Sequence, residues 1–173
     1  VIHRNTRQIA QLFHKKLEMS YEENAVQLTQ YARRYLRKKF LDADVGVTGG
    51  NFLVADNGQI ALFSNEGNIR MSSTVPNIHI AVTGIEKIIP RQRDMAPFIK
   101  LLPASGTGQK ITSYVSFLGG QTYHPEKMSR YVVIIDNNRS RMMKGKNRQM
   151  LTCIHCGACL NVCPIFERGG GHA

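Results

Sequence analysis

The side chains with the most distinctive chemistry in this sequence are four cysteines that fall within eleven residues near its end. They are Cys153, Cys156, Cys159 and Cys163, spaced C-x2-C-x2-C-x3-C, and Pro164 follows the last of them. Gaps of two residues let three thiolates from one loop converge on a single cubane 4Fe–4S cluster. In proteins with two such clusters, the fourth cysteine of this pattern binds the other cluster. The spacing therefore predicts Cys153, Cys156 and Cys159 as ligands of one cluster and Cys163 as a ligand of a second.

Other chemistries fit these cysteines less well. A structural zinc site usually pairs two short Cys or His elements across a longer loop, and the sequence has no second element of that kind. Disulfides between cysteines this close in sequence would be strained. His155 lies between the first two cysteines, and we interpret it as an exposed loop residue rather than a ligand. Zinc remains the alternative metal.

The composition is that of an ordinary soluble domain with an excess of positive charge. Hydrophobic residues make up 42% of the 173 residues, which is enough for a core. No apolar run approaches the roughly 18 residues of a membrane span, and no signal peptide is visible. Because thiolate ligands for iron need a reducing compartment, we expect a cytoplasmic protein without a membrane span.

The net charge of +11 arises from 23 Lys and Arg against 12 Asp and Glu. Basic residues gather at 33–39, interpreted as a solvated helix face, and at 139–148, just before the cysteines. At the second place they could offset the negative charge of a cluster or guide an acidic redox partner. Nucleic acid is not expected as a partner, because no known binding module is visible.

Apolar periodicity predicts several helices. The first is expected at about 6–17. A second should begin at Ser20, because Glu23 three positions later would complete a capping box. Its buried stripe would consist of Leu28, Tyr31, Tyr35, Leu36 and Phe40. A third helix, capped by Asp94, would be stopped by Pro103.

The rest of the chain reads mainly as strands. These are expected near 45–47, 52–55, 60–63, 77–83, 111–118 and 131–136, with a last basic helix at 140–151. Asn57 and Gly58 form the strongest two-residue hairpin signal. The run 132–135 is continuously apolar, which is typical of a strand buried on both faces. His79, within a strand, is interpreted as a hydrogen-bonded buried side chain. Helices and buried strands in alternation indicate a layered α/β domain.

Three loops, at 48–51, 65–68 and 105–109, combine glycine with small polar residues. Such loops can present backbone N–H groups to an anion, although turn geometry alone would also explain each of them. None matches a P-loop or a dinucleotide-binding fingerprint. Because two of the loops follow predicted strands, we predict a ligand pocket lined by Glu66, Asn68 and Arg70. No catalytic triad can be read from the order of residues, so the catalytic residues stay unassigned.

Several runs together resemble one known family. They are residues 48–52, 56–58, 64–68, 82–87, 107–109, 136–137 and 139–141, followed by the cysteine run. In this order they are similar to the LUD domain family, and in particular to its iron–sulfur members in lactate utilisation. The resemblance spans essentially the whole chain.

The resemblance implies a NagB/RpiA/CoA-transferase-like α/β fold and a cytosolic system of three proteins that oxidises L-lactate to pyruvate. This chain would be its iron–sulfur subunit, with the other subunits and a redox partner as partners. Family members are longer at both ends and carry a second cysteine run. We therefore expect an internal fragment, with an incomplete LUD domain at 1–145 and the start of a ferredoxin-like segment at 146–173. The intact protein would hold two 4Fe–4S clusters, which would be absent or incomplete here.

Three functions follow as alternatives. The first is an electron-transfer component, with the LUD domain as a docking or substrate-sensing scaffold. In the second, the LUD pocket itself binds a hydroxy acid or related anion, and Glu66 or its neighbours act in acid–base chemistry. The third is a non-catalytic assembly module with a structural cluster. Whether the chain is itself an enzyme is left open by its residues.

Overall fold

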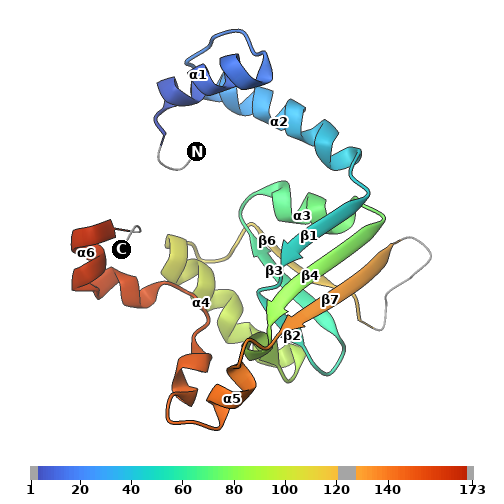
Figure 1. Cartoon of the computed structure of the whole chain (residues 1–173), viewed down its shortest axis with the longest axis vertical. Coiled ribbons are helices and arrows are strands. Elements are labelled where there is room, and N and C mark those ends of the chain that lie inside the picture. The colour runs from blue at the N-terminus through green and yellow to red at the C-terminus, as the bar shows by residue number, and fades with distance from the viewer. Residues whose placement is uncertain (1–3, 121–127, 171–173) are drawn as a thin grey trace. The chain divides into compact units, whose positions relative to one another are not determined.

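The structure is a computed structural model that describes residues 4–120 and 128–170. It divides into two compact units, Val1–Ala43 and Asp44–Ala173 (Figure 1). The division at residues 43 and 44 does not test the predicted boundary between the LUD domain and the ferredoxin-like segment at residues 145 and 146, which stays a prediction.

The first unit consists of helices α1 (Thr6–Leu17) and α2 (Ala25–Leu41). Helix α1 has the predicted bounds, and Asn5 and Gln8 close its start with a reciprocal capping box. The helices share a small core of Ala10, Met19 and Leu28.

Two expectations for the second helix are wrong. Helix α2 begins after Asn24 rather than at Ser20, because the Asn24 side chain accepts the N–H groups of the first turn. The apolar stripe is buried only at its start, at Leu28. Tyr35 and Leu36 are 37% and 48% exposed, because α1 is five residues shorter than α2 and the core of this unit lies at the start of α2.

The second unit contains two sheets (Figure 1). The first is parallel, in the order β1 (Val45–Gly49), β4 (Ile78–Gly84) and β7 (Ser129–Ile135). The second is mixed, in the order β5 (Ile88–Ile89), β2 (Phe52–Val54), β3 (Gln59–Ser64) and β6 (Tyr114–Leu118). Strands β2 and β3 form the predicted hairpin, and Gly58 in its turn has φ +69°. The prediction of an α/β fold is confirmed.

Two helices cover these sheets. Helix α3 (Gly67–Thr74) packs against β1 and β4. Helix α4 (Ala96–Thr107) places Phe98, Ile99 and Leu102 on the core formed by β2, β3 and Met95. Contrary to the prediction, α4 does not stop at Pro103. The Pro103 carbonyl accepts the Gly108 N–H and the Thr107 hydroxyl, so one more turn forms after the proline.

Strand β7 is not buried on both faces as predicted. Within the described residues it pairs only with β4, and its apolar side chains at 132–135 are 38–46% exposed. On the sheet face opposite α3, Val45 and Val47 of β1 are also exposed. The prediction was wrong because a continuous apolar run indicates a strand without showing which elements cover its faces.

A buried hydrogen-bonded network ties the three parallel strands together. His79 of β4 is fully buried, as predicted; its Nδ1 accepts from Arg130 Nε of β7 at 3.1 Å. Since Nδ1 accepts, Nε2 carries the proton and donates to Thr48 Oγ1 of β1 at 2.8 Å. Arg130 also donates to the Ser73 carbonyl at the end of α3. Burial, and then the charge of Arg130, lower the pKa of His79 from 6.5 to about 4.

This lowered pKa predicts a loss of stability in mild acid. Between pH 6.5 and 4 the unfolded chain binds a proton that folded His79 refuses, so the free energy of unfolding falls as pH falls through this window. The loss should reach up to about 3 kcal/mol and be absent above pH 7. Urea unfolding at several pH values measures it. His79→Gln, which can keep both hydrogen bonds, should flatten the pH dependence; an unchanged slope in this variant would contradict the assignment.

A second prediction concerns Gly46 of β1, where the backbone of α3 lies close to the strand. A Cβ atom at Gly46 would lie 1.8 Å from the Ser72 carbonyl oxygen of α3, whereas a Cβ at Gly49 would meet nothing within 4 Å. Gly46→Ala should therefore lower the free energy of unfolding by about 2–3 kcal/mol. The matched variant Gly49→Ala should change it by less than about 0.5 kcal/mol. Equal effects in denaturant titrations would show that α3 does not rest on β1 at this point.

Candidate functional site

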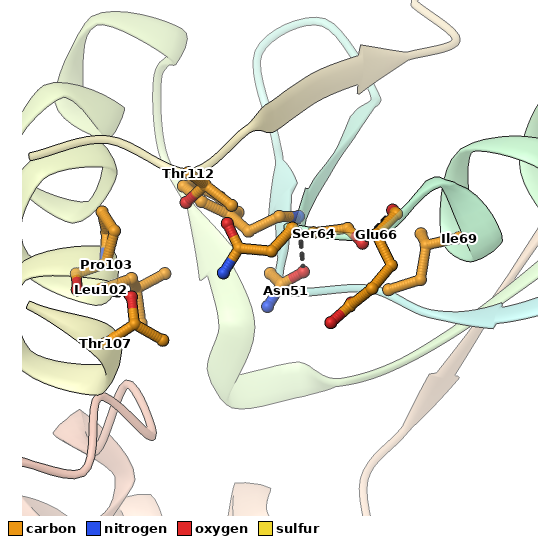
Figure 2. A pocket seen from close by; sticks show the side chains of 10 residues that line it. Asn51, Ser64, Glu66, Ile69, Leu102, Pro103, Thr107 and Thr112 are labelled. Atoms are coloured by element: carbon orange, nitrogen blue, oxygen red, sulfur yellow. Dashed lines mark hydrogen bonds between the residues drawn. The ribbon is translucent and has the colours of Figure 1, made fainter. Parts of the chain in front are cut away.

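A cavity of about 280 Å³ lies where strand β3 meets the first turn of α3 and the last turns of α4. It is lined by Asn51, Phe63, Ser64, Asn65, Glu66, Ile69, Leu102, Pro103, Thr107 and Thr112. Figure 2 shows Leu102, Pro103 and Thr107 on one side and Glu66 and Ile69 on the other. Each of the three glycine-containing loops singled out in the sequence contributes at least one of these residues. The fold therefore gathers these loops, far apart in sequence, around one cavity.

Two asparagines of the cavity are fixed by backbone donors. Asn51 Oδ1 accepts the Phe63 N–H at 2.9 Å, the dashed line in Figure 2. Asn65 Oδ1 accepts the Ser113 N–H at 3.2 Å. Because both carbonyl oxygens are used in this way, the amide NH2 groups are the parts of these side chains suited to hold an acceptor, such as a carboxylate oxygen.

Of the three predicted pocket residues, only Glu66 lines this cavity. It is exposed and precedes α3 without capping the helix through its side chain, so its carboxylate is available to a ligand. The Asn68 side chain instead accepts the Ile69 N–H, and the Arg70 guanidinium lies over the Tyr114 ring. Sequence analysis missed the side-chain roles of Asn51 and Asn65, although both belong to loops that it singled out.

The four cysteines lie among short helical turns. These are η3 (Arg148–Thr152), η4 (Ala158–Val162) and α6 (Pro164–Gly169). No strand occurs in the part of this segment that is described, and a ferredoxin-like fold here stays a prediction. The predicted basic helix at 140–151 is instead divided into α5 (Arg139–Met143) and η3, with a turn at Gly145 between them.

The chemistry of the four thiols suits a cluster better than their placement does. All four cysteines are free and exposed or half-buried, so soft thiolate donors suited to an iron–sulfur cluster are present. Across residues 4–120 and 128–170, however, no three Cys, His, Asp or Glu side chains are gathered closely enough to hold a metal ion. The donor set suits a cluster, whereas the described conformation would have to draw the thiols together to bind one.

The cysteine loop contacts the rest of the second unit at three places. Lys87 Nζ donates to the Cys153 carbonyl at 2.9 Å, and Ile154 packs on the core beneath α4. The backbone N–H of Ala158, and then the Ser105 hydroxyl of α4, lower the pKa of the Cys156 thiol. The last turns of α4 thus line the cavity and also contact the cysteine loop.

A buried ion pair holds the segment that leads to the cysteines. Glu86, just after β4, has a side chain only 9% exposed, and its Oε2 lies 2.7 Å from Arg139 Nε of α5. A Cβ atom at Gly84 would lie 2.1 Å from this carboxylate, so glycine makes room for it. The Ser140 hydroxyl, and then its N–H, lower the pKa of Asp136 at the start of α5. Sequence analysis did not find Glu86 as a structural residue.

No helix within the described ranges is long and apolar enough to cross a membrane.

The parallel sheet and its covering helix define the chain as an α/β protein. The chain belongs to the LUD domain family, whose sequence profile matches residues 1–143.

Curated relatives match nearly the whole chain. Lactate utilization protein B of Bacillus velezensis is 41% identical over 99% of this chain and 37% of its own length. The protein of the same name from Bacillus subtilis is 40% identical over 99% of this chain and 36% of its own, and that from Shouchella clausii 42% over 99% and 37%. The chain thus spans little more than a third of the length of these relatives.

Among solved structures, a DUF162 family protein from Deinococcus radiodurans is similar over 57% of each chain, with 21% identity and a TM-score of 0.40.

Proposed function

We propose that this chain is part of a cytoplasmic iron–sulfur subunit that passes electrons during the oxidation of L-lactate to pyruvate. The observation that carries the proposal is the run of four free cysteines in cluster-binding spacing. The similarity to relatives named lactate utilization protein B supports lactate as the substrate of the system. Its partners would be the other subunits of that system and a redox partner.

The residues of the loop have distinct roles in this proposal. Cys153, Cys156 and Cys159 would hold one 4Fe–4S cluster and Cys163 would contribute to a second; such clusters supply reversible one-electron transfer. The donors that lower the pKa of Cys156 favour its thiolate, which is the form that binds metal. Lys87 fixes the loop through the Cys153 carbonyl and places a positive charge beside it.

The test is the iron and acid-labile sulfide content after anaerobic reconstitution, with an EPR spectrum. A version extended beyond Ala173 should hold about eight irons, and the 173-residue chain few, because each cluster lacks ligands here. Cys156→Ser and Cys163→Ser should each reduce the extended protein to about four irons, and the double variant to few. L-lactate should reduce the clusters only when the partner subunits are present.

His155→Ala, within the same loop, is the matched control and should leave the iron content unchanged. Zinc without sulfide in the extended protein would remove the redox proposal and leave a structural metal site.

A second candidate function is favoured by the cavity at Glu66. The amide NH2 groups of Asn51 and Asn65 could bind a carboxylate, and Glu66 could accept a hydrogen bond from a hydroxyl. A small hydroxy acid presents both groups, and the cavity volume of about 280 Å³ suits a molecule of this size. In this proposal the LUD domain itself binds the substrate.

Titration of the intact protein with L-lactate by calorimetry tests this second function. Glu66→Gln should weaken binding by about tenfold, because the hydroxyl of the ligand would donate to a neutral amide oxygen in place of a charged carboxylate. Asp56→Asn, which makes the same charge change in an exposed turn, should have no effect. Unchanged binding and activity in Glu66→Gln would remove Glu66 from this role.

A further inference from the structure

A second, larger cavity lies between the end of strand β4 and the segment that leads into the cysteines. Its volume is about 610 Å³, within the range of roughly 300–1,000 Å³ typical of small-molecule sites. The residues that line it are Ile85, Glu86, Ile88, Met143, Arg148, Gln149, Leu151 and Thr152. One wall therefore comes from η1 (Ile85–Lys87) and β5, and the other from α5 and η3.

The charges around this cavity favour an anion. Glu86 is already paired with Arg139, so its negative charge is neutralised within the protein. Arg148 is exposed on η3, and within the described ranges its guanidinium has neither a hydrogen bond nor an ion pair. A guanidinium presents parallel N–H donors that match the two oxygens of a carboxylate. Arg148 is thus the cationic residue among those that line the cavity, and the described part of the chain offers its guanidinium no partner.

The other residues that line the cavity favour a ligand with an apolar part. Four of the eight lining residues, Ile85, Ile88, Met143 and Leu151, are apolar, and Ile88 and Met143 are 36% and 55% exposed. Covering such side chains with an apolar ligand removes their surface from water, at about 25 cal/mol per Å². Gln149 and Thr152 add neutral polar groups to the lining.

We propose that this cavity binds an organic anion, with a carboxylate on Arg148 and an apolar body between Ile88, Met143 and Leu151. Such a molecule is larger and less polar than the hydroxy acid suggested for the cavity at Glu66, and it occupies a different place. Thr152 directly precedes Cys153, so the bound molecule lies against the segment that carries the first cysteine.

Binding of 1-naphthoate, which has a carboxylate on an apolar ring, tests the site through the fluorescence of the probe. The chain contains no tryptophan, so its own emission interferes little. The 173-residue chain should bind the probe saturably, and Arg148→Gln should weaken binding by about tenfold. Arg141→Gln removes the same charge from the same basic segment outside the cavity and should change the Kd by less than twofold. Leu151→Asp, which places a negative charge in the apolar wall, should abolish binding.

Further comparisons make the outcome decisive. Equal losses in the two arginine variants would show non-specific attraction to the basic segment and overturn the proposal. The proposal is also overturned if 1-naphthalenemethanol, which lacks the carboxylate, binds as tightly, or if Leu151→Asp still binds the probe. Glu66→Gln should leave naphthoate binding unchanged, so failure of this site and failure of the lactate site are distinguishable. Because Arg148 is exposed, Arg148→Gln should keep the thermal midpoint of the parent chain.

Discussion

The parallel sheet depends on one buried side-chain network, in which His79 receives a hydrogen bond from Arg130 and donates one to Thr48. These residues come from three strands, so the network fixes the register of β1, β4 and β7 relative to one another. Register decides which residues stand together where parallel strands end, and ligands of open α/β sheets bind at that edge. The positions of Glu86 and of the segment that begins at Arg139 follow from it.

Two side-chain contacts near this edge of the sheet hold the segment that carries the cysteines. The Glu86–Arg139 ion pair holds α5 against the end of β4, and Lys87, one residue further, holds the first residue of the cysteine loop. A buried pair of this kind contributes less to stability than its attraction suggests, because both charges lose water. Its value here is positional, since it fixes the direction in which the chain enters the cysteine segment.

The sequence predicted several local features correctly, but it did not predict which elements pack over which strand faces. The bounds of α1, the hairpin turn at Asn57–Gly58 and the burial of His79 follow from apolar periodicity, turn geometry and strand alternation, whereas the capping rule misplaced the start of α2. The exposure of β7 could not be predicted, because burial depends on elements that periodicity does not identify. Glu86 was missed for a related reason, since its partner Arg139 lies 53 positions away in sequence. For the pocket, glycine content indicated the right loops, but only the fold could show that Asn51, rather than Asn68, faces the cavity.

The proline within α4 has a mechanical consequence. Pro103 has no N–H, so the helix lacks the backbone hydrogen bond from this residue to the turn before it, and its last turn is joined to the rest of α4 by fewer bonds. That turn carries Thr107 on the cavity side and Ser105 and Gly106 on the side of Cys156. A small tilt of this last turn about Pro103 would therefore move Thr107 at the cavity and Ser105 beside Cys156 together.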